Sequence, residues 1–190
     1  MTVTPARQPA AGGPGVWPLS IQAYRTLGEL GLLPKNTELL YGQVFQKMSK
    51  SPLHTGLVLR LLRLLQAQLP TGCHLRPEQP LTCADSEPEP DVAVVRGREE
   101  EFWQEHPHTA ELVVEVCVSS HDYDRTKLRA YALAGVKEVW FVLAPEARIE
   151  VYRQPAGGEF SERSRYSAGE SFTSQMLPGF RVNLAEVFGK

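Results

Sequence analysis

The chain has 190 residues, a formal net charge of −2 and a pI of about 6.2, and hydrophobic residues make up 42% of it. This size and composition fit one globular domain that buries about 70% of its unfolded surface. The charge excludes a strongly basic domain that would bind nucleic acid through bulk charge, although a local basic cluster stays possible. No apolar run reaches the ~18 residues of a membrane span, and we see no signal peptide.

The cysteines argue for a reducing compartment. Cys73, Cys83 and Cys117 lack the CxxC spacing of a zinc site. Cys117 lies in an apolar run, which predicts a buried thiol. Cys73 and Cys83 together with His74 offer one ligand fewer than a structural zinc site needs. We therefore expect reduced cysteines and a cytoplasmic protein.

The N-terminal part predicts a tail followed by a short helix. Residues 1–18 are rich in Pro, Ala and Gly and show no apolar period, so we expect a flexible tail. A single domain should then occupy residues 19–190. Ser20 is a candidate N-cap of the helix, and Gly31 is its expected end.

A hairpin and a second helix are expected next. Tyr41-Gly42 separates two β-prone runs, which predicts a hairpin within Glu38–Met48. Leucines recur at helical spacing after Ser51-Pro52, and Pro70-Thr71-Gly72 should end that helix.

Two short apolar runs predict strands that are buried on both faces. The first is Val92–Val95, which directly follows Asp91, and the second is Leu112–Val118. Glu115 interrupts the second run. A carboxylate at such a position is costly unless it is paired or bound to a cation.

The remaining elements complete a mixed sheet. Asp122 or Asp124 is a candidate cap for a helix that should end at Gly135. Further strands are expected at Glu138–Leu143, Arg148–Arg153 and Phe160–Tyr166, and a terminal helix at Leu184–Phe188. The order strand, helix, strand from Glu115 to Leu143 is a βαβ signal, and hairpins flank it. The fold class is therefore α/β, or α+β by a stricter label.

Three residues in this region have the chemistry of a metal-dependent phosphodiesterase site. Asp91 and Glu115 lie on two predicted strands and could hold a hard cation such as Mg²⁺. The metal would polarise a phosphodiester and lower the pKa of a bound water. Lys127 could orient or deprotonate that water. In the alternative interpretation, Glu115 pairs with an arginine and Lys127 is a solvated helix residue.

These residues also carry a resemblance to a known family. Together with further segments of the chain, they resemble the Uma family of putative restriction endonucleases, within the PD-(D/E)XK nuclease superfamily. The resemblance extends over roughly Ser20 to Phe188. The segments that carry the resemblance include Glu38-Leu39-Leu40, Ser51-Pro52 and His54, Pro90-Asp91-Val92-Ala93-Val94, Leu112-Val113-Val114-Glu115-Val116, Asp124-Arg125-Thr126-Lys127-Leu128 and Leu177-Pro178-Gly179-Phe180.

The resemblance implies a restriction-endonuclease-like fold, with a mixed central sheet flanked by helices, and a Mg²⁺ or Mn²⁺ site that acts on DNA. Asp91 matches the first acidic residue and Glu115 the second. The superfamily lysine would ordinarily stand at Cys117, but similar members use a lysine in the following helix, which Lys127 matches. By the same analogy, the Val116 carbonyl is a further metal ligand.

The first hairpin departs from the family pattern of Asp-Gly-Glu, because this chain has Tyr41-Gly42-Gln43. We expect Gln43 or Glu38 to assist the site from the hairpin. The loss of an accessory carboxylate leaves a second hypothesis, a catalytically inactive dimeric binding or scaffold protein. A homodimer is expected because an apolar edge strand at Arg148–Arg153 would invite pairing. For His54, both a site role and a capping or packing role remain open.

Overall fold

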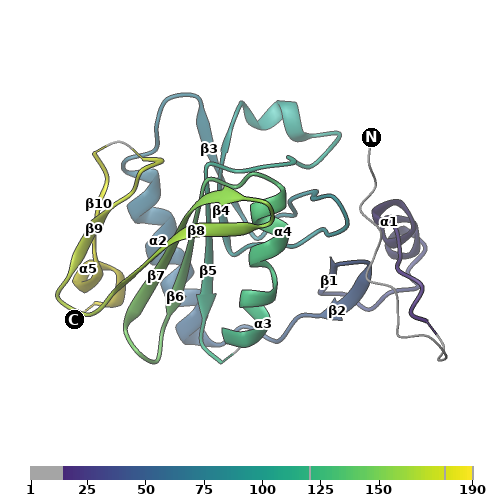
Figure 1. The fold of residues 1–190 in the computed structure, drawn as a ribbon, viewed down its shortest axis with the longest axis horizontal. Helices are drawn as coiled ribbons and strands as arrows, with labels where there is room; N and C mark the ends of the chain where they lie inside the picture. The colour runs from purple at the N-terminus through teal and green to yellow at the C-terminus, as the bar shows by residue number, and fades with distance from the viewer. Residues whose placement is uncertain (1–14, 120, 178, 190) are drawn as a thin grey trace.

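A six-stranded mixed sheet forms the centre of the computed structural model, which describes residues 15–119, 121–177 and 179–189 (Figure 1). The strand order is β3-β4-β5-β6-β7-β8. Strands β5 and β6 pair in parallel, and the other neighbours in this sheet pair antiparallel. The six strands are β3 (Cys73–Pro77), β4 (Val92–Arg96), β5 (Leu112–Cys117), β6 (Glu138–Leu143), β7 (Arg148–Ala156) and β8 (Glu159–Tyr166).

Two small antiparallel sheets lie at opposite ends of the molecule (Figure 1). The β1–β2 hairpin lies beside α1 at one end, and β9–β10 lie beside α5 at the other. The bounds of these strands are Thr37–Leu40 for β1, Gln43–Gln46 for β2, Ser171–Thr173 for β9 and Arg181–Asn183 for β10. The helices are α1 (Ile21–Glu29), α2 (Pro52–Gln66), the 3₁₀ helix η1 (Glu99–Phe102), α3 (His121–Thr126), α4 (Leu128–Leu133) and α5 (Leu184–Phe188).

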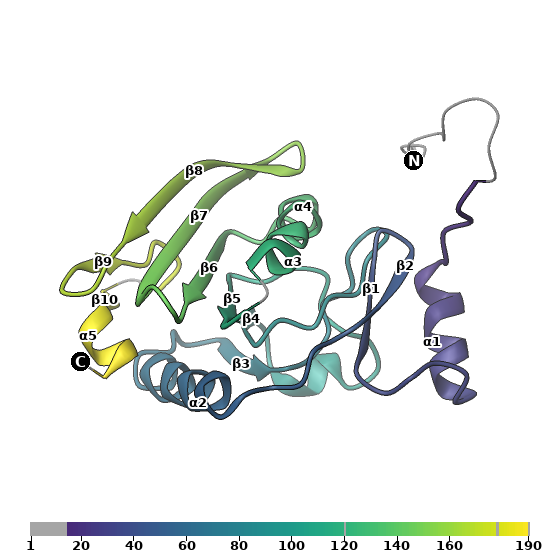
Figure 2. The same ribbon diagram turned by 90° about the horizontal axis from the view of Figure 1, so that it is seen from below.

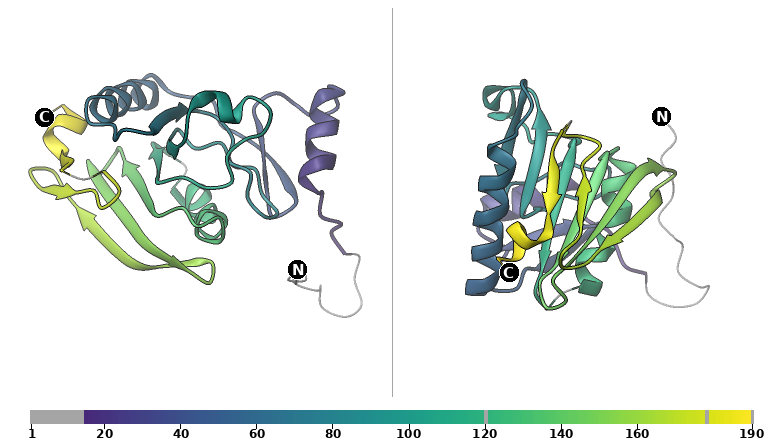
Figure 3. Two further views of the ribbon diagram at one scale, coloured as in Figure 1. Left: turned by 90° about the horizontal axis from the view of Figure 1, so that it is seen from above. Right: turned by 90° about the vertical axis from the view of Figure 1, so that its left-hand side faces the viewer.

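Helices cover both faces of the central sheet. Helix α2 lies on one face, and α3 and α4 lie on the other (Figures 2 and 3). Trp140 packs in the core under α2, whereas Phe141 packs with Tyr131 in the core under α4. Strands β5 and β6 are buried along their whole length. This burial explains why their sequences are nearly continuous apolar runs.

The predicted helix starts and hairpin turn are confirmed. Ser20 accepts a hydrogen bond from the Ala23 N–H at 3.1 Å, and Ser51 accepts one from the His54 N–H at 3.2 Å. Tyr41 and Gly42 have φ of 54° and 74°, as a two-residue type I′ turn requires.

Three predictions were wrong in detail. Strand β7 pairs with β6 on one side and β8 on the other, so it is not an edge strand, and the argument for a dimer from its edge does not hold. Asp122 and Asp124 lie inside α3 and do not cap it. The helix expected to run to Gly135 consists of α3 and α4, which are separated at Lys127.

Smaller points concern the chain ends and the cysteines. Residues 1–14 of the predicted tail lie outside the described residues, and residues 15–18 have no regular secondary structure. The three cysteines are free. Within the described ranges, no helix combines the length and the apolar character needed to cross a membrane.

Candidate active site

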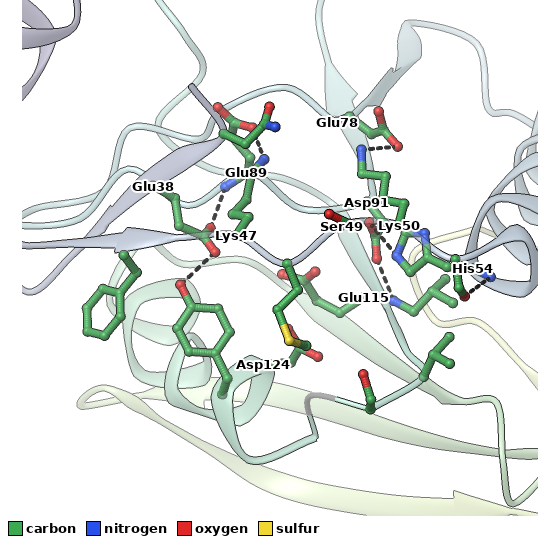
Figure 4. Close-up of a pocket in the computed structure, with 18 of the residues that line it drawn as sticks. Glu38, Lys47, Ser49, Lys50, His54, Glu78, Glu89, Asp91, Glu115 and Asp124 are labelled. Carbon is green, nitrogen blue, oxygen red and sulfur yellow. Dashed lines mark hydrogen bonds and ion pairs between the residues drawn. The ribbon is translucent and has the colours of Figure 1, made fainter. Parts of the chain in front are cut away.

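A cavity of about 670 Å³ opens where the β1–β2 hairpin, the start of α2, the ends of β4 and β5, and α3 meet. Figure 4 shows Glu38, Asp91, Glu115 and Asp124 pointing into it. The charged residues that line it are Glu38, Lys47, Lys50, Glu78, Glu89, Asp91, Glu115, Asp124 and Lys127, and His54 and Val116 line it as well. Six carboxylates therefore face three lysines.

Lys127 is the buried cation of this cavity. Its Nζ lies 3.1 Å from Glu38 Oε1, 3.3 Å from Glu115 Oε1 and 3.9 Å from Asp124 Oδ1. Burial by itself would lower the pKa of Lys127, but Glu115, Glu38 and Asp124 outweigh it and raise that pKa above its usual value. The amine therefore stays protonated and acts as a hydrogen-bond donor and a positive charge.

Glu115 is the buried acid that the sequence marked as costly. Its Oε1 accepts a hydrogen bond from the Tyr131 hydroxyl at 2.5 Å, and only 3% of the residue is exposed. Burial raises the pKa of Glu115 to about 8; Lys127 opposes this shift, and Asp91 adds to it. The partner of Glu115 is thus a lysine, not the arginine of the alternative interpretation.

Asp91 is held on both of its oxygens at the start of β4. Its Oδ2 accepts a hydrogen bond from the Val116 N–H at 2.7 Å. Its Oδ1 lies 3.1 Å from Nε2 of His54, in the first turn of α2. Asp91 is therefore fixed next to the main chain that follows Glu115, and His54 contacts a predicted site residue directly.

The hairpin contributes Glu38 but not Gln43. Glu38 is fully buried and accepts hydrogen bonds from the Glu89 N–H at 3.1 Å and from the Tyr123 hydroxyl at 2.8 Å. Gln43 is exposed at the turn end of β2 and does not line the cavity. Of the two hairpin residues expected to assist the site, only Glu38 therefore lies at the cavity.

Tyr41 has a different use from the acidic residue of the family pattern. Its hydroxyl donates to the Thr126 carbonyl at 2.5 Å and accepts from the Ala130 N–H at 3.2 Å. These two contacts span the break between α3 and α4, which is where Lys127 lies. The hairpin therefore braces the segment that carries the lysine.

Two of the side chains that contact Lys127 and Glu115 were not predicted from the sequence. Asp124 lies in the cavity 3.9 Å from Lys127, and Tyr131 hydrogen-bonds Glu115. The spacing of three residues between Asp124 and Lys127 on a helical segment was a usable signal, because such pairs face each other. Tyr131 carried no signal beyond its apolar periodicity.

The donor set fits a divalent cation. Among the described residues, no group of three or more His, Cys, Asp and Glu side chains is arranged to hold a metal ion. Mg²⁺, however, needs only one or two carboxylates, because it keeps several waters. Glu38, Glu115 and Asp124 surround one lysine, and Asp91 adds a further charge that raises the pKa of Glu115. A dication would balance this excess of negative charge.

Residues 29–185 match the model of the Uma2 family, which is described as "Putative restriction endonuclease". The chain belongs to the Uma2 family. This membership and the mixed central sheet confirm the predicted family and fold class.

A solved structure supports the same fold. The chain is similar to a protein from Anabaena variabilis ATCC 29413, described as a putative nuclease belonging to DUF820, with a TM-score of 0.73 and 16% sequence identity. The similarity covers 86% of this chain and 97% of that one. No curated protein matches the chain.

Proposed function

We propose that this Uma2 protein is a metal-dependent DNA endonuclease that hydrolyses phosphodiester bonds. The observation that carries the proposal is the convergence of Asp91, Glu115 and Lys127 at one cavity, although they come from two strands and a helix break. The family description supports the same class of reaction.

In this proposal Asp91 and Glu115, with the Val116 carbonyl, would hold Mg²⁺ or Mn²⁺. The bound metal would polarise the phosphodiester and acidify a water molecule. Lys127 would orient the attacking water and neutralise charge on the phosphate, because the neighbouring carboxylates keep its amine protonated. Glu38 assists by holding the amine of Lys127, at 3.1 Å from its Oε1. His54 and the Val116 N–H fix the orientation of the Asp91 carboxylate.

A plasmid-nicking assay with Mg²⁺ or Mn²⁺ tests the proposal. Asp91→Asn should lower the rate about 10³-fold, on the scale seen when one group that stabilises a transition state is removed. A matched control is Glu100→Gln, an exposed acid in η1. EDTA should abolish nicking by the wild type. Equal activity in the wild type, Asp91→Asn and Glu115→Gln would show a contaminating nuclease and refute the assignment.

Calorimetric titration with Mg²⁺ or Mn²⁺ tests the metal site without turnover. We expect binding at millimolar concentration or below, and its loss in Asp91→Asn. If neither cation binds the wild type, the second hypothesis of an inactive binding or scaffold protein is favoured.

The homodimer also remains a prediction. Because β7 lies inside the central sheet, any pairing of central sheets between two copies would have to use β3 or β8, its two edge strands. Sedimentation velocity that detects only monomer would reject the dimer.

A further inference from the structure

A cluster of arginines surrounds a buried glutamate on the outer side of α3. Glu150, in β7, accepts hydrogen bonds on Oε1 from Arg163 at 2.8 Å and from Arg165 at 2.9 Å, both on β8. Its Oε2 accepts from Arg125 of α3 at 3.2 Å and from the Tyr152 hydroxyl at 2.8 Å. Nothing in the mechanism proposed above uses these arginines.

The cluster lies close to the cavity. Glu115 pairs with Phe141, and Phe141 pairs with Glu150, so the two glutamates stand in one row across three neighbouring strands. Two strand spacings separate their Cα atoms by about 10 Å. Helix α3 joins the two places, because Asp124 lines the cavity and the next residue, Arg125, contacts Glu150.

The arginines keep hydrogen-bond donors and positive charge for another partner. The side chains of Arg163 and Arg165 are 48% and 51% exposed. A guanidinium has five N–H donors, and each of these two uses one nitrogen, Nη2, toward Glu150.

The local charge is positive in a chain whose net charge is −2. Arg125 also lies 3.7 Å from Asp122, so three arginines face two carboxylates, which leaves a charge of +1. Arg148 is two residues before Glu150 and therefore on the same face of β7, and it makes no ion pair within the described residues. It is a further positively charged side chain on this face of β7.

We propose that Arg163 and Arg165, oriented by Glu150, bind the sugar–phosphate backbone of the nucleic acid whose scissile bond enters the cavity. The proposal rests on the proposed function. Planar guanidinium groups match phosphate oxygens in two-point hydrogen bonds, which favours arginine over lysine for this task. In this proposal the arginines contact the backbone beside the cavity, because Asp124 of the cavity and Arg125 of the cluster are neighbours in α3.

A purely structural role predicts something different. In that case the arginines only satisfy Glu150 and tie β8 to α3, and DNA affinity does not depend on them. The salt dependence of binding distinguishes a DNA-binding role from a purely structural role, because each phosphate contact adds about 0.9 to the slope of log Kd against log salt concentration.

The test measures binding of a fluorescein-labelled 20-base-pair duplex by anisotropy, with Ca²⁺ present and the probe checked for cleavage afterwards. We expect Arg163→Gln/Arg165→Gln to weaken binding roughly tenfold at about 0.1 M salt and to lower the slope by about 1.8, for two lost phosphate contacts. The matched control is Arg96→Gln/Arg98→Gln, at the end of β4 away from Asp91, and its slope should stay that of the wild type.

Each outcome decides a separate question. If the wild type binds the duplex and the Arg163→Gln/Arg165→Gln variant binds it equally well, with an unchanged salt slope, the inference is overturned and the nuclease proposal stands. If the wild type binds the duplex and the variant does not, the inference is supported. If the wild type in that case also fails to cleave DNA in Mg²⁺ or Mn²⁺, the nuclease proposal is refuted. If the wild type does not bind the duplex, both proposals fail.

A conservative variant covers the case in which the glutamine variant does not fold, as judged by circular dichroism. Arg163→Lys/Arg165→Lys keeps both charges but loses the planar fork. We expect the salt slope to be retained and Kd to rise about threefold. An unchanged Kd in this folded variant would overturn the inference.

Discussion

Glu115 and Glu150 occupy equivalent places in the sheet and behave in opposite ways. Both are buried, both lie on the face under α3 and α4, and Phe141 stands between them in the same row. Burial raises the pKa of Glu115 to about 8, since Lys127 is outnumbered by acids. Burial would also raise the pKa of Glu150, but hydrogen bonds from Tyr152, Arg163 and Arg125 outweigh it and lower the pKa to about 2.

The difference shows that burial in the sheet raises the pKa of either carboxyl group, and that the neighbouring charges decide whether the net pKa shift is upward or downward. Around Glu115 the carboxylates exceed the cations, so the folded chain holds unbalanced negative charge. Such an arrangement costs stability. Around Glu150 the arginines exceed the carboxylates, and the ionised glutamate is stabilised.

The largest expected effect is on cleavage, and it should separate the two glutamates. Glu115→Gln removes a proposed metal ligand and should lower kcat about 10³-fold. Glu150→Gln should instead raise KM for DNA, because it disturbs Arg163 and Arg165, which we propose bind the backbone. Steady-state nicking kinetics measure both. A large loss of kcat in Glu150→Gln would contradict the assignment of Glu115 to catalysis and Glu150 to DNA binding.

Acid should weaken the fold through Glu150. Its folded pKa of about 2 lies below the ordinary value of 4.5, so its contribution is present above pH 4.5 and is lost as the pH falls toward 2. A shift of this size corresponds to about 3 kcal/mol of unfolding free energy. Urea unfolding between pH 5 and pH 2.5 measures it, with Glu150→Gln as the reference. The same pH dependence in wild type and variant would contradict the assignment.

At pH 8, the two glutamine variants should change stability in opposite directions. Glu150→Gln leaves the arginines without their carboxylate and should lower the free energy of unfolding by about 2 kcal/mol. Glu115→Gln relieves the excess of buried acid and should raise it by about 1 kcal/mol, since a raised carboxyl pKa means that ionisation destabilises the folded state as the pH rises. Urea unfolding in the absence of divalent cations compares them. A loss of stability in Glu115→Gln would mean that its pairing with Lys127 dominates.

The smallest effect concerns the brace at Lys127. Tyr41→Phe removes the hydroxyl that bridges Thr126 and Ala130, which should cost about 1 kcal/mol. Tyr166→Phe is the matched control, because that hydroxyl makes no hydrogen bond with the residues that the structure describes. Urea unfolding of the two variants at pH 7 checks the prediction. Equal stability of both variants would show that the brace contributes nothing.

Local patterns in the sequence determined the elements and much of the candidate site. Ser20 and Ser51 cap the helices that they were expected to cap. The turn at Tyr41-Gly42 was expected because two β-prone runs flank it, and the structure gives both residues a positive φ. A charged residue inside an apolar run marked Glu115, since burial of an ion is costly wherever it occurs. The order of residue types along the predicted elements pointed to Asp91 and Lys127 as its partners, and the family resemblance implied the same residues.

Only the tertiary structure decided which charges meet. Sequence distance hides the contact of Glu38 with Lys127, because the hairpin and the helix break come together only once the sheet has formed. The order of the strands put β7 inside the sheet and placed Arg163 and Arg165 of β8 against Glu150. Periodicity and capping act over a few residues and can be read along the chain, whereas the pairing of buried charges depends on the packing of the whole sheet.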